Sequence, residues 1–172
     1  MYQLLPCRDR VPLDTPLELH PLPNSITWDG AIAYLDRDGV LNKGSPNYIN
    51  SPSEVITLPK AGTCVAELRR SGMRVAVVTN QSPIGRGLWD SENLANIHDK
   101  LQAALLLEDS DALIDLFLHS PYPPYNDAWA RKPRPGMLEA ARQLIDYADS
   151  EEDWSDFELK FGRKWTHRPS EE

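Results

Sequence analysis

The chain has 172 residues, of which 41% are hydrophobic, and its 26 acidic and 18 basic side chains give a net charge of −8. This length and composition predict one globular domain with a substantial core, and the negative charge argues against unspecific binding to nucleic acid or to an anionic membrane. No apolar run reaches the roughly 18 residues of a membrane span, and no signal pattern opens the chain, so the sequence predicts a cytoplasmic protein.

The first 29 residues differ from the rest because they hold five prolines and show little periodicity. We therefore expect an irregular N-terminal arm over 1–29, one domain over 30–168 and a polar end over 169–172. Within the domain, short apolar runs predict buried strands at 31–35, 73–79 and 113–119. Stretches with apolar residues at helical spacing alternate with these runs and predict helices at 59–70, 92–108 and 136–148.

This alternation of strands and helices indicates an α/β fold. Three strand–helix repeats predict a Rossmann-like parallel sheet with helices on both faces. The segment FELKFG at 157–162 alternates apolar and polar residues and is compatible with a short fourth strand. Little chain follows it, so we expect a shortened C-terminal part and a monomer whose open sheet edge is covered by the N-terminal arm or a partner.

Polar side chains follow each predicted strand. They are Asp36 and Asp38 after the first strand, Thr79 and Asn80 at the end of the second, and Arg131 and Lys132 in the loop beyond the third. Because the carboxyl ends of parallel strands meet at one edge of a sheet, we expect these groups to converge there. The sequence therefore predicts a polar ligand site at that edge.

Asp36 and Asp38 stand two positions apart in an extended segment, so their carboxylates project the same way and repel each other. A Mg²⁺ ion bound by both carboxylates, together with water and phosphate oxygens, is the simplest way to neutralise these two charges. Asp36 could then attack phosphorus to form an aspartyl phosphate, while Asp38 protonates the leaving oxygen and later activates water. Thr79 and Asn80 would hydrogen-bond the phosphoryl oxygens, and Lys132 would neutralise negative charge.

Three blocks resemble the haloacid dehalogenase (HAD) superfamily, and in particular its heptose bisphosphate and histidinol-phosphate phosphatases. The blocks are DRDGV at 36–40, TNQSPIGRG at 79–87 and RKPRPGM at 131–137, and Tyr48 and LPKAG at 58–62 also fit the pattern. The resemblance covers most of the chain from Ala31 onward and makes 30–168 a HAD-like phosphatase domain. Three blocks in the right order are a much more specific signal than DxDG alone.

The resemblance implies a nucleophile at Asp36, an acid/base at Asp38, a phosphate-binding hydroxyl at Thr79 and a charge-neutralising lysine at Lys132. It also implies that Arg86 and Arg131 contact the rest of a small phosphorylated metabolite. The substrate that fits best is D-glycero-D-manno-heptose 1,7-bisphosphate, and histidinol phosphate comes second. The glycines that flank Arg86 would let backbone amides approach the phosphate or sugar.

The chain departs from the family pattern at two places. The four zinc ligands that the subfamily often carries are lost, because their positions read Ser120-Pro121-Tyr122 and Ala128-Trp129-Ala130, so we expect no zinc. We expect Tyr122, Tyr125, Trp129 and the neighbouring prolines to hold that loop instead.

The second departure concerns the fourth family motif, which FGRKWTH at 161–167 resembles in degenerate form. Arg163 stands where a metal-binding aspartate is expected. Either Asp156 replaces that ligand, or the Arg163 guanidinium itself neutralises the charges of Asp36 and Asp38. The main hypothesis is a Mg²⁺-dependent phosphatase. The alternatives are a non-catalytic or weakly active phosphate-binding relative and a truncated gene product.

Overall fold

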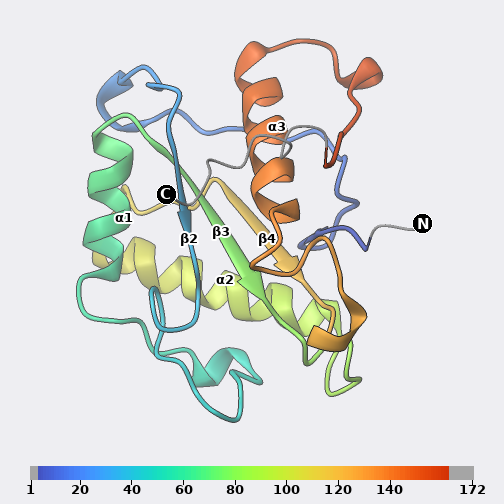
Figure 1. Ribbon diagram of the computed structural model, residues 1–172. Helices are drawn as coiled ribbons and strands as arrows, with labels where there is room; N and C mark the ends of the chain where they lie inside the picture. Colours follow the sequence, from blue (N-terminus) through green and yellow to red (C-terminus); the bar gives the residue numbers. More distant parts are fainter. Residues whose placement is uncertain (1–3, 163–172) are drawn as a thin grey trace, which may run out of the picture.

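A four-stranded sheet with the order β1-β4-β3-β2 forms the centre of the protein (Figure 1). The computed structural model describes residues 4–162. Three strands run parallel: β2 (Ile32–Leu35), β3 (Arg74–Asn80) and β4 (Leu116–Ser120). In register, Leu35 lies beside Val77 and Asn80 lies beside Ser120, so the three carboxyl ends meet at one edge as the sequence predicts.

Strand β3 shows why the sheet is covered on both faces. Val75 and Val77 belong to one buried apolar cluster, and Ala76 and Val78 belong to another. Both faces of β3 therefore lie in the core, which explains the unbroken apolar run in its sequence. This confirms the predicted central strand.

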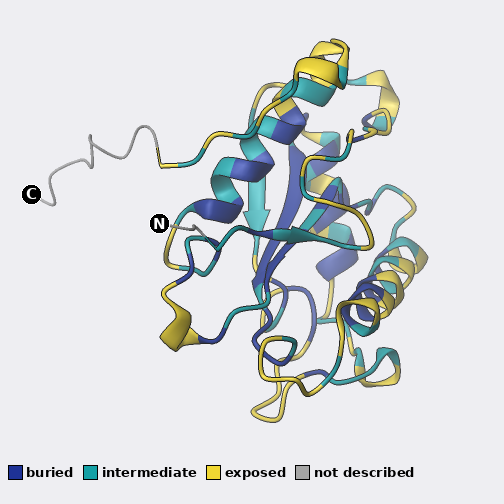
Figure 2. Ribbon diagram, turned by 90° about the vertical axis from the view of Figure 1, so that its right-hand side faces the viewer, coloured by how far each residue is buried: buried dark blue, intermediate teal, exposed yellow. Residues whose placement is uncertain are grey.

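Three helices form the outer layers. Helices α1 (Ala61–Arg70) and α2 (Ser91–Glu108) pack on one face, and α3 (Gly136–Ser150) packs on the other, with the buried strands between them (Figure 2). The side chain of Asp90 accepts a hydrogen bond from Asn93 N, so Asp90 is the N-cap of α2. The α/β prediction with helices on both faces is confirmed. No helix within residues 4–162 combines the length and apolarity needed to cross a membrane.

The N-terminal arm is more ordered than its composition suggests. Cys7–Arg8 forms strand β1, which pairs antiparallel with the outer edge of β4. Leu17 and Leu22 are buried, at 8% and 4% exposure. The arm is irregular apart from β1 and the short 3-10 helix Pro23–Ser25, and its strand forms because the edge of β4 gives Cys7–Arg8 backbone partners. The arm covers that edge of the sheet, as we expected.

The segment 157–162 is not a strand. Its backbone is held by α3 instead, because Lys160 N donates to Gln143 Oε1 and Gln143 Nε2 donates to Lys160 O, both at 2.8 Å. Phe157, Leu159 and Phe161 pack against the core beside α3, which accounts for their apolar alternation. Among the described residues β2 remains the other edge of the sheet. Residues 163–167 of the expected fourth motif, Arg163 among them, lie outside the described residues.

Candidate active site

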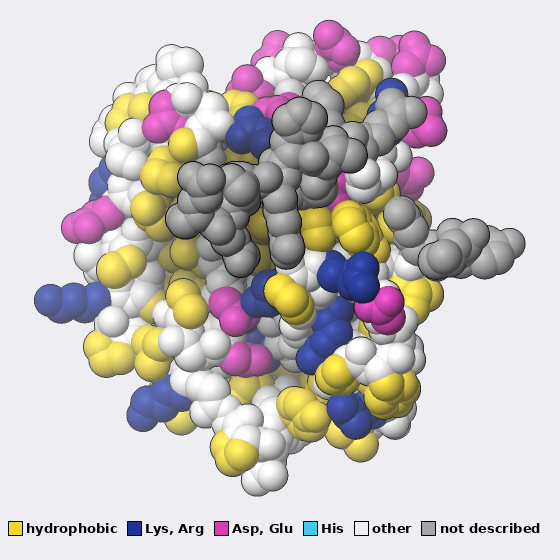
Figure 3. Space-filling model, viewed as in Figure 1, with side chains coloured by type: hydrophobic (Ala, Val, Ile, Leu, Met, Phe, Trp, Pro, Cys, Tyr) yellow, Lys and Arg dark blue, Asp and Glu magenta, His cyan; other side chains and the backbone are white. Residues whose placement is uncertain are grey.

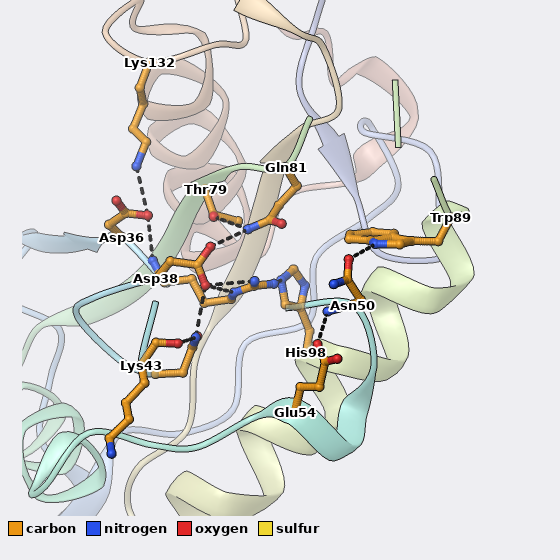
Figure 4. A network of polar contacts seen from close by, with 12 residues as sticks. Asp36, Asp38, Lys43, Asn50, Glu54, Thr79, Gln81, Trp89, His98 and Lys132 are labelled. Atoms are coloured by element: carbon orange, nitrogen blue, oxygen red, sulfur yellow. Dashed lines mark hydrogen bonds and ion pairs between the residues drawn. The ribbon is translucent and has the colours of Figure 1, made fainter. Parts of the chain in front are cut away.

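The first carboxylate after β2, Asp36, pairs with the lysine that follows β4 (Figure 4). Lys132 Nζ lies 3.1 Å from Asp36 Oδ1, and Arg37 N donates to the same oxygen at 2.7 Å. Both side chains of the ion pair remain accessible, at 45% for Asp36 and 30% for Lys132. The structure thus brings together two residues that are far apart in the sequence, at the edge where we expected them.

The second carboxylate, Asp38, accepts hydrogen bonds on both oxygens. Arg37 Nη2 and Nε and Asn42 Nδ2 donate to Oδ1 at 2.9, 3.2 and 3.0 Å, and Gln81 Nε2 donates to Oδ2 at 3.1 Å. Burial disfavours the charged form of Asp38, but the Arg37 charge and the hydrogen bonds from Asn42, Arg37 and Gln81 outweigh it and lower the pKa of this carboxyl. Asp38 is therefore ionised at neutral pH.

The end of β3 supports both sides of the site. Thr79 is buried, and its hydroxyl oxygen accepts from Gln81 Nε2 at 2.8 Å, so one amide group joins Thr79 to Asp38. Asn80 holds the loop that carries Lys132: its Oδ1 accepts from Lys132 N at 3.0 Å and its Nδ2 donates to Lys132 O at 3.2 Å. The structure thus gives Asn80 a role that the sequence did not suggest, which is to place Lys132.

Arg86 and Arg131 lie on the two loops that follow β3 and β4. Arg86 is exposed, with Nε 3.3 Å from Ser82 Oγ, and Arg131 is half-buried and donates to Tyr122 O at 3.1 Å. Basic and acidic side chains lie side by side over the carboxyl ends of the strands (Figure 3). This mixture of charge lets the edge of the sheet receive an anion although the whole chain is acidic.

The loop that carries Arg86 depends on a close approach at Gly85. Gly85 N donates to Pro121 O at 2.9 Å, and a Cβ at this position would lie 2.3 Å from the same oxygen. The expected role of this glycine is therefore wrong: its amide meets the loop after β4, not a ligand, and the missing side chain lets the two loops touch.

Replacing Gly85 with alanine should separate these loops. We expect a loss of about 2 kcal/mol in the free energy of unfolding and a lower kcat/KM, because Arg86 moves with its loop. Gly44→Ala is the matched control, since its Cβ would have its nearest neighbour at 3.8 Å. Chemical denaturation of both variants checks the prediction; equal stability of Gly85→Ala and Gly44→Ala would contradict it.

Two histidines are buried next to the site, His98 on α2 and His119 on β4, each 1% exposed. Burial lowers the pKa of both, and that of His119 falls from 6.5 to about 4. Between pH 6.5 and about pH 4, His119 binds a proton in the unfolded chain but not in the folded one. The folded state must therefore lose stability as the pH falls through this window.

We expect the free energy of unfolding to drop by about 3 kcal/mol through His119 as the pH falls from 6.5 to 4. Denaturation curves at several pH values measure this slope. His119→Gln should flatten the slope, whereas the same slope in both proteins would rule out His119 as its source.

Comparisons with known proteins add an independent finding. No family model matches the chain. The D-glycero-beta-D-manno-heptose-1,7-bisphosphate 7-phosphatase of Bordetella bronchiseptica is 39% identical over 116 residues, which cover 66% of this chain and 64% of that protein. A Thermoplasma volcanium protein named a probable D-glycero-D-manno-heptose-1,7-bisphosphate 7-phosphatase is 31% identical over 114 residues, covering 66% of this chain and 75% of that protein.

The chain belongs to the heptose-1,7-bisphosphate 7-phosphatase family of HAD-like proteins. Its match spans 64% and 60% of the lengths of the relatives from B. bronchiseptica and Pseudomonas aeruginosa. The resemblance stated from the three sequence blocks is thereby confirmed.

Solved structures agree with this family. The D,D-heptose 1,7-bisphosphate phosphatase of B. bronchiseptica, solved with magnesium and phosphate, has a TM-score of 0.62 at 36% identity and matches 67% of this chain and 64% of that one. A Mesorhizobium loti protein named a putative HAD-like phosphatase has a TM-score of 0.61 at 28% identity and matches 84% of this chain and 66% of that one. The HAD-like fold is therefore shown by sequence and structure together.

The loop where family members often carry zinc is held by other contacts in this chain. Tyr122 donates to Leu5 O at 3.1 Å, and Trp129 Nε1 donates to Glu139 Oε1 at 2.6 Å. Ala128 and Ala130 are buried, and Ala130 N donates to Leu4 O. Tyr125 was expected to help but is 75% exposed, because its segment turns outward at the loop tip. The loop thus rests on the N-terminal arm and α3, and the absence of zinc stays a prediction.

Asp156 does not complete a metal site with Asp36 and Asp38. It lies on a short 3-10 helix (Trp154–Asp156) just beyond the C-terminal end of α3, whereas Lys132 precedes the N-terminal end. A helix of this length separates its ends by roughly 22 Å, so the carboxylate of Asp156 cannot reach the site. Within residues 4–162 no group of three His, Cys, Asp or Glu side chains gathers to hold a metal.

The residues present suit a Mg²⁺ ion that keeps water ligands. Asp36 Oδ2 accepts no hydrogen bond from any described residue, whereas both oxygens of Asp38 are already engaged. Asp36 therefore fits as the carboxylate ligand, with water and phosphate oxygens completing the shell. That the Asp38 side chain also holds the metal stays a prediction, and both of its oxygens accept hydrogen bonds in this structure.

Proposed function

We propose that the chain hydrolyses the phosphate ester of a small phosphorylated sugar through an aspartyl phosphate on Asp36. The observation that carries the proposal is the Asp36–Lys132 pair at 3.1 Å beside the ionised Asp38, at the carboxyl ends of the parallel strands. The names of the relatives favour D-glycero-D-manno-heptose 1,7-bisphosphate as the substrate, with loss of the 7-phosphate.

In the first step the Asp36 carboxylate attacks phosphorus, the bond from phosphorus to the ester oxygen breaks, and that oxygen takes a proton from Asp38. Asp38 is ionised before the phosphate arrives, so it must first take a proton from the solvent. The negative charge of the bound phosphate favours this because it raises the pKa of a neighbouring carboxyl. Lys132 neutralises charge on Asp36 and on the phosphoryl group.

In the second step Asp38, now ionised again, takes a proton from water, and the water oxygen attacks the phosphorus of the aspartyl phosphate. The bond to Asp36 breaks, which releases phosphate and restores the carboxylate. Thr79 and Gln81 fix the orientation of Asp38 through their shared hydrogen bonds. Mg²⁺, held by Asp36, would supply further charge neutralisation of the phosphate.

A phosphate-release assay on a panel of sugar and alcohol phosphates tests this function. We expect release from heptose 1,7-bisphosphate at the highest kcat/KM, a lower value for histidinol phosphate, and loss of release on chelation of Mg²⁺. Background-level release from the whole panel, with retained binding of inorganic phosphate, would instead support the non-catalytic alternative.

A further inference from the structure

A row of four polar side chains, of which the two in the middle are buried, leads from the N-terminal arm to Asp38. Asp9 Oδ2 lies 2.8 Å from His98 Nδ1, and His98 Nε2 lies 3.4 Å from Arg37 Nη1. Arg37 then donates to Asp38 through Nη2 and Nε at 2.9 and 3.2 Å (Figure 4 shows His98 and Asp38). The side chains of Arg37 and His98 are 0% and 1% exposed, so water cannot replace these contacts.

The partners of His98 determine which ring nitrogen carries the proton. Asp9 can only accept a hydrogen bond, so Nδ1 carries the hydrogen, and Nε2 keeps its lone pair for the Arg37 guanidinium. Burial lowers the pKa of His98, which agrees with a neutral ring. A proton on Nε2 would place two N–H groups against each other and drive Arg37 away.

Contacts outside the row fix the positions of His98 and Asp9. The His98 ring stacks on Phe117 of β4, with centroids 4.6 Å apart and planes 19° from parallel. Asp9 directly follows β1, and its neighbour Arg10 pairs with Glu92 and Asp99 on α2 at 3.0 and 2.9 Å. The arm therefore presents Asp9 to His98 from a rigid base.

We propose that His98 and Asp9 are positioning residues of the catalytic site, which hold Arg37 against Asp38 and make the N-terminal arm part of that site. Without an acceptor at His98 Nε2, the Nη1 group of the buried Arg37 would lose its only partner among the described residues. An unpaired buried guanidinium group is costly, so Arg37 would turn and release Asp38 Oδ1. The expected fall of kcat rests on the proposed phosphatase function, whereas the contacts among Asp9, His98 and Arg37 do not.

Kinetics of three variants test the proposal. His98→Phe keeps the stacked ring but removes both polar atoms, so kcat should fall by about tenfold or more at unchanged KM. His98→Gln offers an amide oxygen to Arg37 and an amide N–H to Asp9, so it should recover most of the lost kcat. His20→Phe is the control: it makes the same chemical change at an exposed histidine of the arm, outside the row, and kcat should stay at the wild-type value.

A measurement that needs no turnover separates this proposal from the proposed function. In nitrogen-15 NMR spectra of the wild type, we expect His98 as the neutral ring with its hydrogen on Nδ1, and an Arg37 Nε–H signal that exchanges slowly. His98→Gln should keep that arginine signal and His98→Phe should lose it. These signals test the row even if the protein hydrolyses none of the phosphates.

Three outcomes would overturn the proposal. One is a hydrogen on His98 Nε2, or a charged ring, in the wild type at neutral pH. The second is wild-type kcat in a folded His98→Phe. The third is a fall of kcat in His98→Gln as large as the fall in His98→Phe, because a purely structural role of the His98 ring would give that pattern.

Discussion

Replacing Asp36 with asparagine should lower kcat by about 10³-fold or more and leave the fold intact. An amide is a far weaker nucleophile than a carboxylate, so the aspartyl phosphate cannot form. The stability should change little, because Asp36 and Lys132 are 45% and 30% exposed and an accessible ion pair contributes about 1 kcal/mol or less. Phosphate release and thermal unfolding, measured on the same samples, check both statements.

Asp156→Asn is the matched control for this substitution. It makes the same chemical change at an exposed aspartate beyond the far end of α3, so kcat should remain at the wild-type value. An Asp36→Asn protein that keeps a tenth or more of the wild-type kcat would exclude Asp36 as the nucleophile. A large loss in Asp156→Asn would restore Asp156 as a member of the site.

Replacing Asp115 with asparagine should produce the largest loss of stability, about 3–5 kcal/mol in the free energy of unfolding. The Asp115 side chain is 0% exposed, and its Oδ1 faces Arg69 Nη1 at 2.6 Å and Arg74 Nη1 at 3.0 Å. Asp115 is the residue before β4, and its Oδ2 accepts a hydrogen bond from Val75 N of β3 at 2.8 Å. Among residues 4–162, Asp115 is the only acidic side chain paired with the buried Arg69 and Arg74, so asparagine leaves both guanidinium charges unbalanced and disturbs the β3–β4 contact.

A nearby exposed pair provides the comparison for Asp115. Asp111 Oδ2 lies 2.9 Å from Arg70 Nε, but these side chains are 35% and 37% exposed. Asp111→Asn should therefore cost about 1 kcal/mol or less, since water screens this pair. Chemical denaturation of both variants decides the matter, and similar losses in the two would show that burial does not control the contribution of these ion pairs.

The main elements of the fold were predictable from local patterns. The apolar runs and helical spacings located three strands and three helices, because each of these elements has to bury a face. Strand β1 was missed because Cys7–Arg8 is too short to show periodicity and forms only by pairing with β4. The alternation at 157–162 predicted a strand, but Gln143 satisfies the backbone of Lys160 instead.

The candidate site was predictable where strand order alone brings residues together. Asp36 and Lys132 follow parallel strands, so their meeting follows from topology. Arg37 and His98 were missed because they contact each other across 61 positions of the sequence. Neither the middle residue of DRD nor a single histidine on a predicted helix indicates such a contact. Asp156 is near the fourth motif in sequence, but it lies beyond the C-terminal end of α3 and therefore away from the site.

The covalent state of Asp36 during turnover is the most direct test of the proposed chemistry. The protein is mixed with Mg²⁺ and heptose 1,7-bisphosphate, quenched with acid within the first turnovers, and digested for peptide mass spectrometry. We predict one added phosphoryl group on the peptide that contains Asp36, at the aspartate that precedes Arg37, and no such group in Asp36→Asn. Phosphate release without any adduct at Asp36, or with the adduct on another residue, would contradict the mechanism.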